Sequence, residues 1–500
     1  MTAFSPGEDA PRCGALRRTT LAMTGVAALL ILGGCALQPT YVAPAQAVPD
    51  AWSATTPTIA GIGQPLAPTP VWWRALGDRA IDTLTDAALA DNPTLAQALA
   101  RLDEARASSG ATEAARWPTV GASAGLTRAQ SQNTGNAAAG ATVQTSAFGA
   151  GPSLSWEVDL FGRVRHSMEA AQSRLDARGA DAASARLAVA ADIANNVLSL
   201  RACDNSRRVL ASDIASRETT LALTRRRLNA GFAAPVDEAR AVSGLATIRT
   251  NLALQEEQCT RLVNALVALS GQDARTVRAL TVVSDPVTAT EPVFMPQAPA
   301  AQPALPASVL TRHPSVVAAE REVAAAWAEI GVARANRMPR LDLAAVLTGQ
   351  WIRAAGSTLD FTTWSLGPSL TGTLFDGGAG AANVSAAEAR YRRAVAALQG
   401  TVRSTVQEVE NALAAQTSAA ARSASTRDGV SAARTTLQAS EAQWKAGAIS
   451  LFELEDSRRQ LASAQDAEIS ARRDQTQSWI ALVKATGGHI TSTTENLRHE

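Results

Sequence analysis

The chain has 500 residues, and its 46 lysines and arginines are balanced by 45 aspartates and glutamates. This balance argues against a protein that binds nucleic acid or an anionic surface. Aromatic residues make up only 4% of the sequence. Long helices in close contact fit so few large side chains better than the thick core of a globular enzyme does.

The amino terminus has the layout of a secretory signal. Three arginines between positions 12 and 18 precede an apolar run from Leu21 to Leu32. A basic segment followed by about a dozen apolar residues is typical of export signals. The run is shorter than the roughly 20 apolar residues that a transmembrane helix needs. We therefore predict that residues 1–34 are a signal peptide.

The end of this segment, Leu32-Gly33-Gly34-Cys35, resembles a bacterial lipobox. The resemblance implies that the Cys35 thiol is acylated and that residues 35–80 form a lipid-anchored N-terminal segment. Position 36 is Ala36 and not the aspartate that retains such lipoproteins in the inner membrane, which implies sorting to the outer membrane. Several acyl chains, each contributing about 0.8 kcal/mol per buried CH2, make a firm anchor. An ordinary signal peptide with a chance cysteine is the alternative.

Most of the mature sequence consists of two related halves. The ordered matches are Asp91-Asn92-Pro93 with Arg312-His313-Pro314 and Trp117-Pro118 with Met338-Pro339 at an offset of 221, then Gly151–Leu154 with Gly367–Leu370, Ala230-Gly231 with Ala446-Gly447 and Leu269–Gly271 with Ala485–Gly487 at an offset of 216. Such self-similarity indicates structural repeats. We predict a first repeat at 81–271, a proline-rich linker at 272–307, a second repeat at 308–488 and a tail at 489–500.

Each repeat begins with a helix and two strands. In the first repeat we predict a helix over about 81–116, which ends at Trp117 because the residue before a proline is pushed out of the helical region. Alternating residues predict strands over 119–128 and 147–158, with an exposed loop at 131–146 between them. The second repeat follows the same plan, with strands through 341–347 and 364–370 and a loop near 353–360.

The strands point to an assembly of several chains. Alternating segments of about ten residues are typical of a barrel that crosses a membrane, with one face toward lipid and the other toward water. Four strands cannot close a barrel, and open strand edges are not tolerated in lipid. The chain is therefore expected to form a homo-oligomer.

The region 181–270 has the pattern of a helical hairpin. Apolar residues recur at the spacing of a coiled-coil seam, and the seam positions pair as 193 with 269, 200 with 262, 203 with 259, 210 with 252 and 214 with 248, so that every pair adds up to 462. This mirror symmetry about Gly231 predicts two antiparallel helices of about 60 Å each, with the glycine at the turn. It also sets Cys203 opposite Cys259, either as a disulfide or as two buried thiols.

Together these features resemble the TolC-like outer-membrane efflux factors, specifically their lipoprotein branch. The motifs that carry the resemblance are the lipobox, Trp72-Trp73, Asp159-Leu160-Phe161-Gly162, Leu374-Phe375-Asp376-Gly377-Gly378 and the repeated hairpin turns at Gly231 and Gly447. The family implies a mixed α and β membrane protein: a homotrimer with a shared transmembrane β-barrel, four strands per chain, continued by a long periplasmic α-helical barrel. It also implies a passive exit channel in the outer membrane of a Gram-negative bacterium, working with a periplasmic adaptor (membrane fusion) protein and an inner-membrane RND-type pump.

The resemblance further implies a periplasmic gate at the hairpin tips. Acidic residues after the second glycine turn would ring the pore, and here these are Glu453 and Asp456, which a spacing of three places on one helical face. Two solvated surface acids are the alternative. Trp444 stands where the family often has tyrosine and Ile449 where it often has a basic residue, so the usual latch is in doubt. Asp237 is the weaker candidate at the corresponding position of the first repeat.

No enzyme, cofactor or metal site is expected. The four histidines, His166, His313, His489 and His499, lack metal-ligand spacing. Nothing indicates a nucleophile beside a base, as a periplasmic hydrolase would require. Within transport, drug-type efflux is favoured, with a metal-efflux or type I secretion channel as the alternative. A non-pore periplasmic scaffold lipoprotein of coiled coils would explain the anchor and the hairpins but not the strands.

Overall fold

The computed structural model describes residues 38–53, 71–132, 142–281, 294–299, 301–303, 306–354, 356–488 and 490–492. The predicted signal peptide and Cys35 lie outside these residues, as does most of the predicted tail. The chain divides into two units, a sheet unit that holds four long strands and a hairpin unit that holds most of the two helical hairpins.

The two repeats contain matching elements. Those of the first are α2 (Arg79–Asp91), α3 (Pro93–Ala114), β1 (Thr119–Gln132), β2 (Thr142–Val158), α4 (Arg163–Asn229) and α5 (Pro235–Ser270). Those of the second are α7 (Pro306–Leu310), α8 (Pro314–Ala335), β4 (Arg340–Ala354), β5 (Ser357–Thr371), α9 (Ala379–Lys445) and α10 (Leu451–Ala485). Helices α3 and α8 have 22 residues each, and α4 and α9 have 67 each. Helix α8 starts 221 residues after α3, and α9 starts 216 residues after α4. The predicted tandem repeat is therefore confirmed.

Shorter elements lie where the sequence predicted an anchored segment, a linker and a tail. They are η1 (Trp72–Leu76), α6 (Ala274–Thr281), β3 (Ala301–Pro303) and β6 (Ile490–Ser492). Strand β3 pairs antiparallel with β6. The predicted linker and the start of the predicted tail therefore contain regular structure.

The prediction of one helix over 81–116 is wrong. Helix α2 ends at Asp91 and α3 starts at Pro93, because Asn92 precedes a proline and has an extended backbone, with φ −70° and ψ 124°. The Asn92 Oδ1 accepts hydrogen bonds from the backbone N–H groups of Thr94 (2.9 Å) and Leu95 (3.3 Å). Asn92 thus separates the two helices and caps the second.

The predicted loops are too long. Strand β1 continues to Gln132, β2 starts at Thr142, and only residues 355 and 356 separate β4 from β5. The ladder continues in register through polar pairs such as Gln130 with Gln144. Backbone hydrogen bonds do not depend on side-chain polarity, so the strands extend beyond the segments whose alternation marks them in the sequence.

The four long strands form one antiparallel sheet in the order β1-β2-β4-β5. Its register aligns the apolar residues of successive strands, for example Leu126 with Phe148 and Phe148 with Trp351. The other side of the sheet carries mainly glycine, serine and threonine in β1 and β2. Within the described chain, β1 and β5 each have a neighbour on one side only. The protomer therefore presents two open strand edges and an apolar face.

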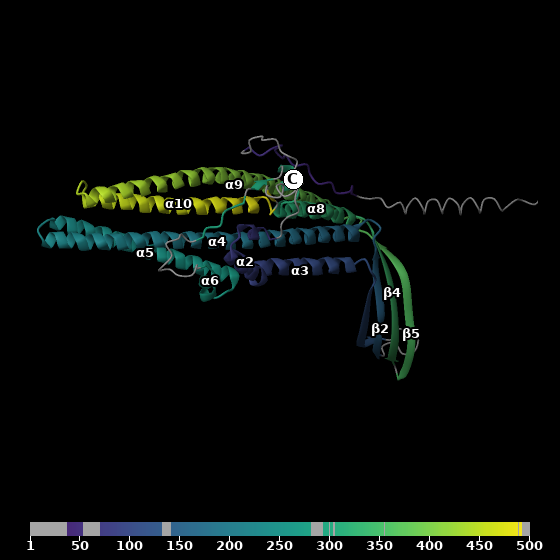
Figure 1. The fold of residues 1–500 in the computed structure, drawn as a ribbon. Coiled ribbons are helices and arrows are strands. Elements are labelled where there is room, and N and C mark those ends of the chain that lie inside the picture. The colour runs from purple at the N-terminus through teal and green to yellow at the C-terminus, as the bar shows by residue number, and fades with distance from the viewer. Residues whose placement is uncertain are drawn as a thin grey trace, which may run out of the picture. The chain divides into compact units, whose positions relative to one another are not determined.

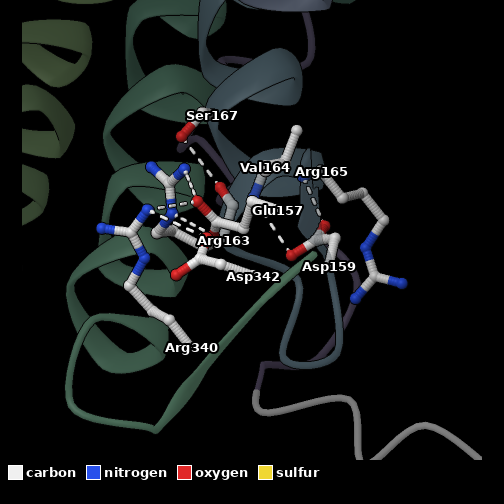
Figure 2. A network of polar contacts seen from close by, with 8 residues as sticks. All are labelled: Glu157, Asp159, Arg163, Val164, Arg165, Ser167, Arg340 and Asp342. Carbon is white, nitrogen blue, oxygen red and sulfur yellow. Dashed lines mark hydrogen bonds and ion pairs between the residues drawn. The ribbon is translucent and has the colours of Figure 1, made fainter. Parts of the chain in front are cut away.

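The turn from β2 into α4 is held by a network of charges (Figure 2). Glu157, near the end of β2, accepts hydrogen bonds from Arg163 (Nε 2.7 Å, Nη2 2.6 Å) and from Arg340 at the start of β4 (Nη2 2.7 Å). The Asp159 carboxylate accepts from the backbone N–H groups of Val164 (3.2 Å) and Arg165 (2.8 Å) and so caps α4. The Asp159-Leu160-Phe161-Gly162 motif thus lies directly before a long helix and caps its first turn.

The corresponding motif of the second repeat also lies directly before a long helix. Asp376 accepts hydrogen bonds from the backbone N–H groups of Gly378 (2.8 Å) and Gly380 (2.6 Å) ahead of α9. The bond from Gly380, followed by that from Gly378, lowers the pKa of the Asp376 carboxyl below its ordinary value. Gly377 and Gly378 both have positive φ (64° and 93°), which a glycine adopts without the strain of a side chain.

Helices α4 and α5 form one antiparallel hairpin, and α9 and α10 form the other (Figure 1). None of the helices in the described ranges is both long and apolar enough to cross a membrane. The largest apolar core packs Trp72 and Trp73 against α4, α5 and α10, with the ring centres of Trp72 and Trp479 5.9 Å apart. Beside this core, Arg201 of α4 is buried against Asp78, which lies before α2.

Candidate functional site

Each hairpin tip turns on one glycine with positive φ, Gly231 (77°) and Gly447 (71°). Both turns have the same hydrogen bonds at an offset of 216. Gly231 N donates to Leu228 O (2.9 Å), as Gly447 N does to Trp444 O (2.9 Å). In each turn the backbone N–H of the residue after the glycine also donates to a carbonyl oxygen in the last turn of the preceding helix. This is the pattern of a helix end closed by a left-handed residue. The sequence therefore determines both tips locally.

Helices α5 and α10 begin directly after these turns, and the two acids at their third positions have the same local bond. The Glu453 Oε2 accepts from the backbone N–H of Ser450 (2.7 Å), while Ser450 Oγ accepts from the backbone N–H of Glu453 (3.2 Å). Asp237 Oδ2 accepts from the backbone N–H of Ala234 (3.1 Å). Glu453 is therefore part of a capping box, although it is exposed.

Asp456 is the second acid of the predicted gate. Its carboxylate accepts hydrogen bonds from Arg459, one turn further along α10, and from Gln460 Nε2 (2.7 Å). The bond from Arg459 lowers the pKa of Asp456 below its ordinary value. Asp456 therefore carries a negative charge at neutral pH, with a positive charge beside it.

Trp444 lies half-buried at the edge of a groove of about 640 Å³ between the two hairpin tips. Two exposed aromatic side chains also line it, Phe232 (76% exposed) and Phe452 (65% exposed). Arg227 and Arg240 of the first hairpin are part of the same wall. The groove thus combines aromatic and cationic side chains at the end of the hairpin unit.

Glu455 is a tip residue that the sequence reasoning missed. Its Oε1 accepts hydrogen bonds from Thr220 Oγ1 of α4 (2.6 Å) and from Arg458 Nη1 (2.9 Å). It therefore ties the second hairpin to the first. Successive residues of a helix point about 100° apart, so the spacing that groups Glu453 with Asp456 assigns Glu455 to another face. Only its contact with Thr220 reveals its role.

Cys203 of α4 and Cys259 of α5 are joined by a disulfide, with their Cα atoms 5.7 Å apart. Both residues are buried in the core. The covalent bond therefore links the two arms of the first hairpin far from its tip.

Cys35 lies outside the residues that the structure describes, so the lipid anchor remains a prediction. Among the described side chains, no group of three or more histidines, cysteines, aspartates and glutamates is arranged to hold a metal ion.

The sequence and the fold both match known proteins. The family model for outer membrane efflux proteins matches residues 84–272 and again residues 305–488. The outer membrane protein OprJ of Pseudomonas aeruginosa is 30% identical, covering 93% of this chain and 95% of OprJ. The pyoverdine export outer membrane protein OpmQ of the same organism is 28% identical, covering 93% of this chain and 96% of its own.

A solved structure shares the fold over nearly the whole length. The crystal structure of a membrane protein from Pseudomonas aeruginosa superposes with a TM-score of 0.76 at 29% identity, covering 90% of this chain and all of the other. Both repeats, the four-stranded sheet and the long hairpins are thus those of the TolC-like fold. The chain belongs to the outer membrane efflux protein family: it is an outer-membrane efflux channel and not an enzyme.

Proposed function

We propose that this chain is a lipid-anchored homotrimer that forms the exit duct of a tripartite efflux system. In this proposal an inner-membrane RND-type pump supplies the energy, a periplasmic adaptor connects the pump to the duct, and small molecules such as drugs leave passively through the trimer. The single observation that carries the proposal is the four-stranded sheet with open edges at β1 and β5.

The open edges support a closed assembly of several copies. Unpaired backbone groups are too costly in hydrocarbon, so β5 of one chain must pair with β1 of the next until the sheet closes. Any whole number of four-stranded chains gives the even strand count of bacterial outer-membrane barrels, and the number three comes from the family resemblance. The apolar side chains on one face, such as Leu126, Leu366 and Trp364, are exposed in the protomer and would then meet lipid.

The groove at the hairpin tips supports docking of the adaptor. Exposed Phe232 and Phe452 lie beside Arg227 and Arg240, and aromatic and arginine side chains are enriched in the centres of protein interfaces. The name of OpmQ describes it as a pyoverdine export protein. This substrate is that of OpmQ and is not assigned to the present chain. For this chain we propose drug-type efflux, because the predicted lipid anchor favours the drug-efflux channels within the family.

The proposal is tested by reconstituting the purified protein in planar lipid bilayers. We expect discrete conductance steps, and on gels a trimer that dissociates only on heating. A monomer without conductance would overturn the proposal and would favour a scaffold without a pore.

The same recording tests the gate. In the variant Glu453→Gln with Asp456→Asn we expect weaker cation preference, because a trimer would lose six carboxylates near its axis. Glutamine also serves in a capping box, so α10 should still begin normally. Asp237→Asn at the corresponding position is the matched control and should have the smaller effect. Unchanged selectivity in the double variant would remove Glu453 and Asp456 from the gate.

The lipid anchor is tested by Cys35→Ser. We expect the variant to lose its acyl chains, detected by mass spectrometry of the mature amino terminus, because serine offers no thiol. The protein should also be released or mislocalised on membrane fractionation. If the mature wild-type protein began at a residue other than Cys35, with or without an acyl chain, the lipobox assignment would be contradicted.

A further inference from the structure

The apolar face of the sheet ends in a polar row that crosses all four strands. In strand order, the residues that the register aligns in this row are Arg128, Ser146, Arg353 and Thr358. Because successive residues of a strand point to opposite faces, Arg128 and Arg353 are the only basic residues on this face of the described strands. Both are exposed. Two guanidinium groups therefore lie on one face and at one level of the sheet.

The height of this row matches the edge of a hydrocarbon layer. The next row, two residues nearer the helices on each strand, is Leu126, Phe148, Trp351 and Asp360. The apolar face starts at the opposite end with the row Val158, Leu341 and Leu370. Phe148 and Val158 are ten residues apart, which corresponds to about 25 Å at about 3.4 Å per residue and a strand tilt of about 40°. Outer-membrane barrels have an apolar band of about this height with aromatic residues at its borders, so the arginine row lies at the level of lipid headgroups.

The row lies at the end of the sheet that is remote from the helices. Strands β1 and β4 start directly after α3 and α8, and β2 and β5 end directly before α4 and α9. Arg128 and Arg353 are near the other ends of their strands, where β1 ends at Gln132 and β4 ends at Ala354. In the proposed channel the helices are periplasmic, so this row faces the outer leaflet. In a Gram-negative outer membrane that leaflet consists largely of lipopolysaccharide, a glycolipid whose acylated sugar carries phosphate groups.

Both guanidinium groups are available to an anion. The Arg128 Nη2 donates to Gln144 Oε1 (2.9 Å), a neutral acceptor on the same face, and its charge stays unpaired. Neither Arg128 nor Arg353 forms an ion pair with any residue that the structure describes. Within the described strands, the one acid on this face is Asp360, which lies opposite Trp351 and not opposite an arginine. The row itself is therefore cationic.

We propose that Arg128 and Arg353 bind the phosphate groups of lipopolysaccharide in the outer leaflet. A guanidinium group binds phosphate through two parallel N–H···O bonds. The two arginines are two strand spacings apart, about 10 Å at the backbone, with the half-buried Ser146 between them. Phe148 and Trp351 lie directly below, where the acyl chains of the same lipid would pack. An amphiphile with phosphate above its acyl chains fits this order of charged and apolar rows.

The inference rests on the proposed function, because only a channel in this orientation exposes the row to the outer leaflet. It is tested by native mass spectrometry of the purified full-length protein titrated with lipid A, the phosphorylated anchor of lipopolysaccharide. We expect Arg128→Gln with Arg353→Gln to weaken lipid A binding by about tenfold or more, because bonds to charged groups are lost. The control Arg427→Gln with Arg434→Gln removes the same charge from exposed positions of α9 and should bind as the wild type does. Asp360→Asn removes the one acid of the face and should not weaken binding.

Two further lipids identify what the site recognises. Dephosphorylated lipid A keeps the acyl chains and should bind the wild type much more weakly. Phosphatidylglycerol carries a phosphate without the acylated sugar and should also bind more weakly than lipid A. Equal binding of either lipid and lipid A by the wild type would overturn the inference, as would equal lipid A binding by the wild type and the Arg128 and Arg353 double variant.

Folding and transport are measured on the same samples. The Arg128 and Arg353 double variant should keep the heat-sensitive trimer band and the conductance steps in planar bilayers, because both side chains lie on the face away from the lumen. A wild-type channel of normal conductance that does not bind lipid A would overturn this inference and leave the proposed function standing. A wild-type monomer without conductance would overturn both.

Discussion

Replacing Asp78 by alanine should lower the free energy of unfolding by about 3–5 kcal/mol, because it leaves the Arg201 guanidinium buried without a counter-charge. The Asp78 side chain is 1% exposed and that of Arg201 is 7% exposed. Arg201 donates to both Asp78 carboxylate oxygens (3.2 and 3.3 Å) and to Thr281 O (2.5 Å). Asp78 also accepts from the backbone N–H of Ala80 (2.8 Å) and caps α2, so the same substitution weakens the start of that helix.

The unfolding midpoint in urea, followed by tryptophan fluorescence, measures this effect, since Trp72 and Trp73 lie in the neighbouring core. Glu257→Ala is the matched control. Its partner Arg261 is on an exposed helix surface, with side-chain exposures of 76% and 55% for the pair, so its loss should cost less than about 1 kcal/mol. Equal midpoints for both variants would contradict the importance of the buried pair.

The double variant Asp78→Ala with Arg201→Met separates the lost attraction from the stranded charge. Removing both charged groups leaves no buried ion, and exchanges of this kind are often close to neutral. We expect the double variant to be more stable than Asp78→Ala alone. A further loss on adding Arg201→Met would mean that the bond from Arg201 to Thr281 stabilises the protein by itself.

Removing the disulfide with Cys203→Ala and Cys259→Ala should also have a large effect. The bond closes a loop with a sequence separation of 56, for which the chain-entropy model gives about 4 kcal/mol of stabilisation. The bond restricts the unfolded chain, so the loss should appear as a lower unfolding midpoint while the native trimer and its conductance persist.

The reduced wild-type protein is the control for this variant. It lacks the covalent bond but keeps both sulfur atoms, so its midpoint should lie close to that of the double variant and slightly above it. Alkylation of the unreduced protein should leave Cys203 and Cys259 unlabelled. Labelling of both residues in the unreduced protein would contradict the disulfide. An unfolding midpoint that does not change after reduction would show that the apolar seam holds the two helices of the hairpin together without the disulfide.

The extent of the first hairpin shows where sequence reasoning stops. The seam predicts a hairpin over 181–270, whereas α4 starts at Arg163. Seam residues repeat only where the two arms face each other. The first turns of α4 pack against α8 instead, with contacts such as Arg174 to Glu329 at a separation of 155 residues. No local periodicity reveals such a partner.

The gate candidates show a related limit. The residue types and their spacing suggest that Glu453 and Asp456 act together, and the structure gives each a local role as well. Glu453 closes a capping box with Ser450, and Asp456 pairs with Arg459. Serine three residues before glutamate is a readable capping signal, so the bond of Glu453 could have been found in the sequence. The link from Glu455 to Thr220 could not.

The sequence by itself determined the tandem repeat, the glycine turns, the hairpin seam and the alternating strands, because each depends on residues a few positions apart or on the repetition of a pattern. Only the tertiary structure decided that Asp78 is buried against Arg201 and that α8 is enclosed while α3 is exposed. These features depend on which surfaces meet after the chain has folded back over more than a hundred residues. Burial and ion pairing are properties of that packing and leave no periodic trace in the sequence.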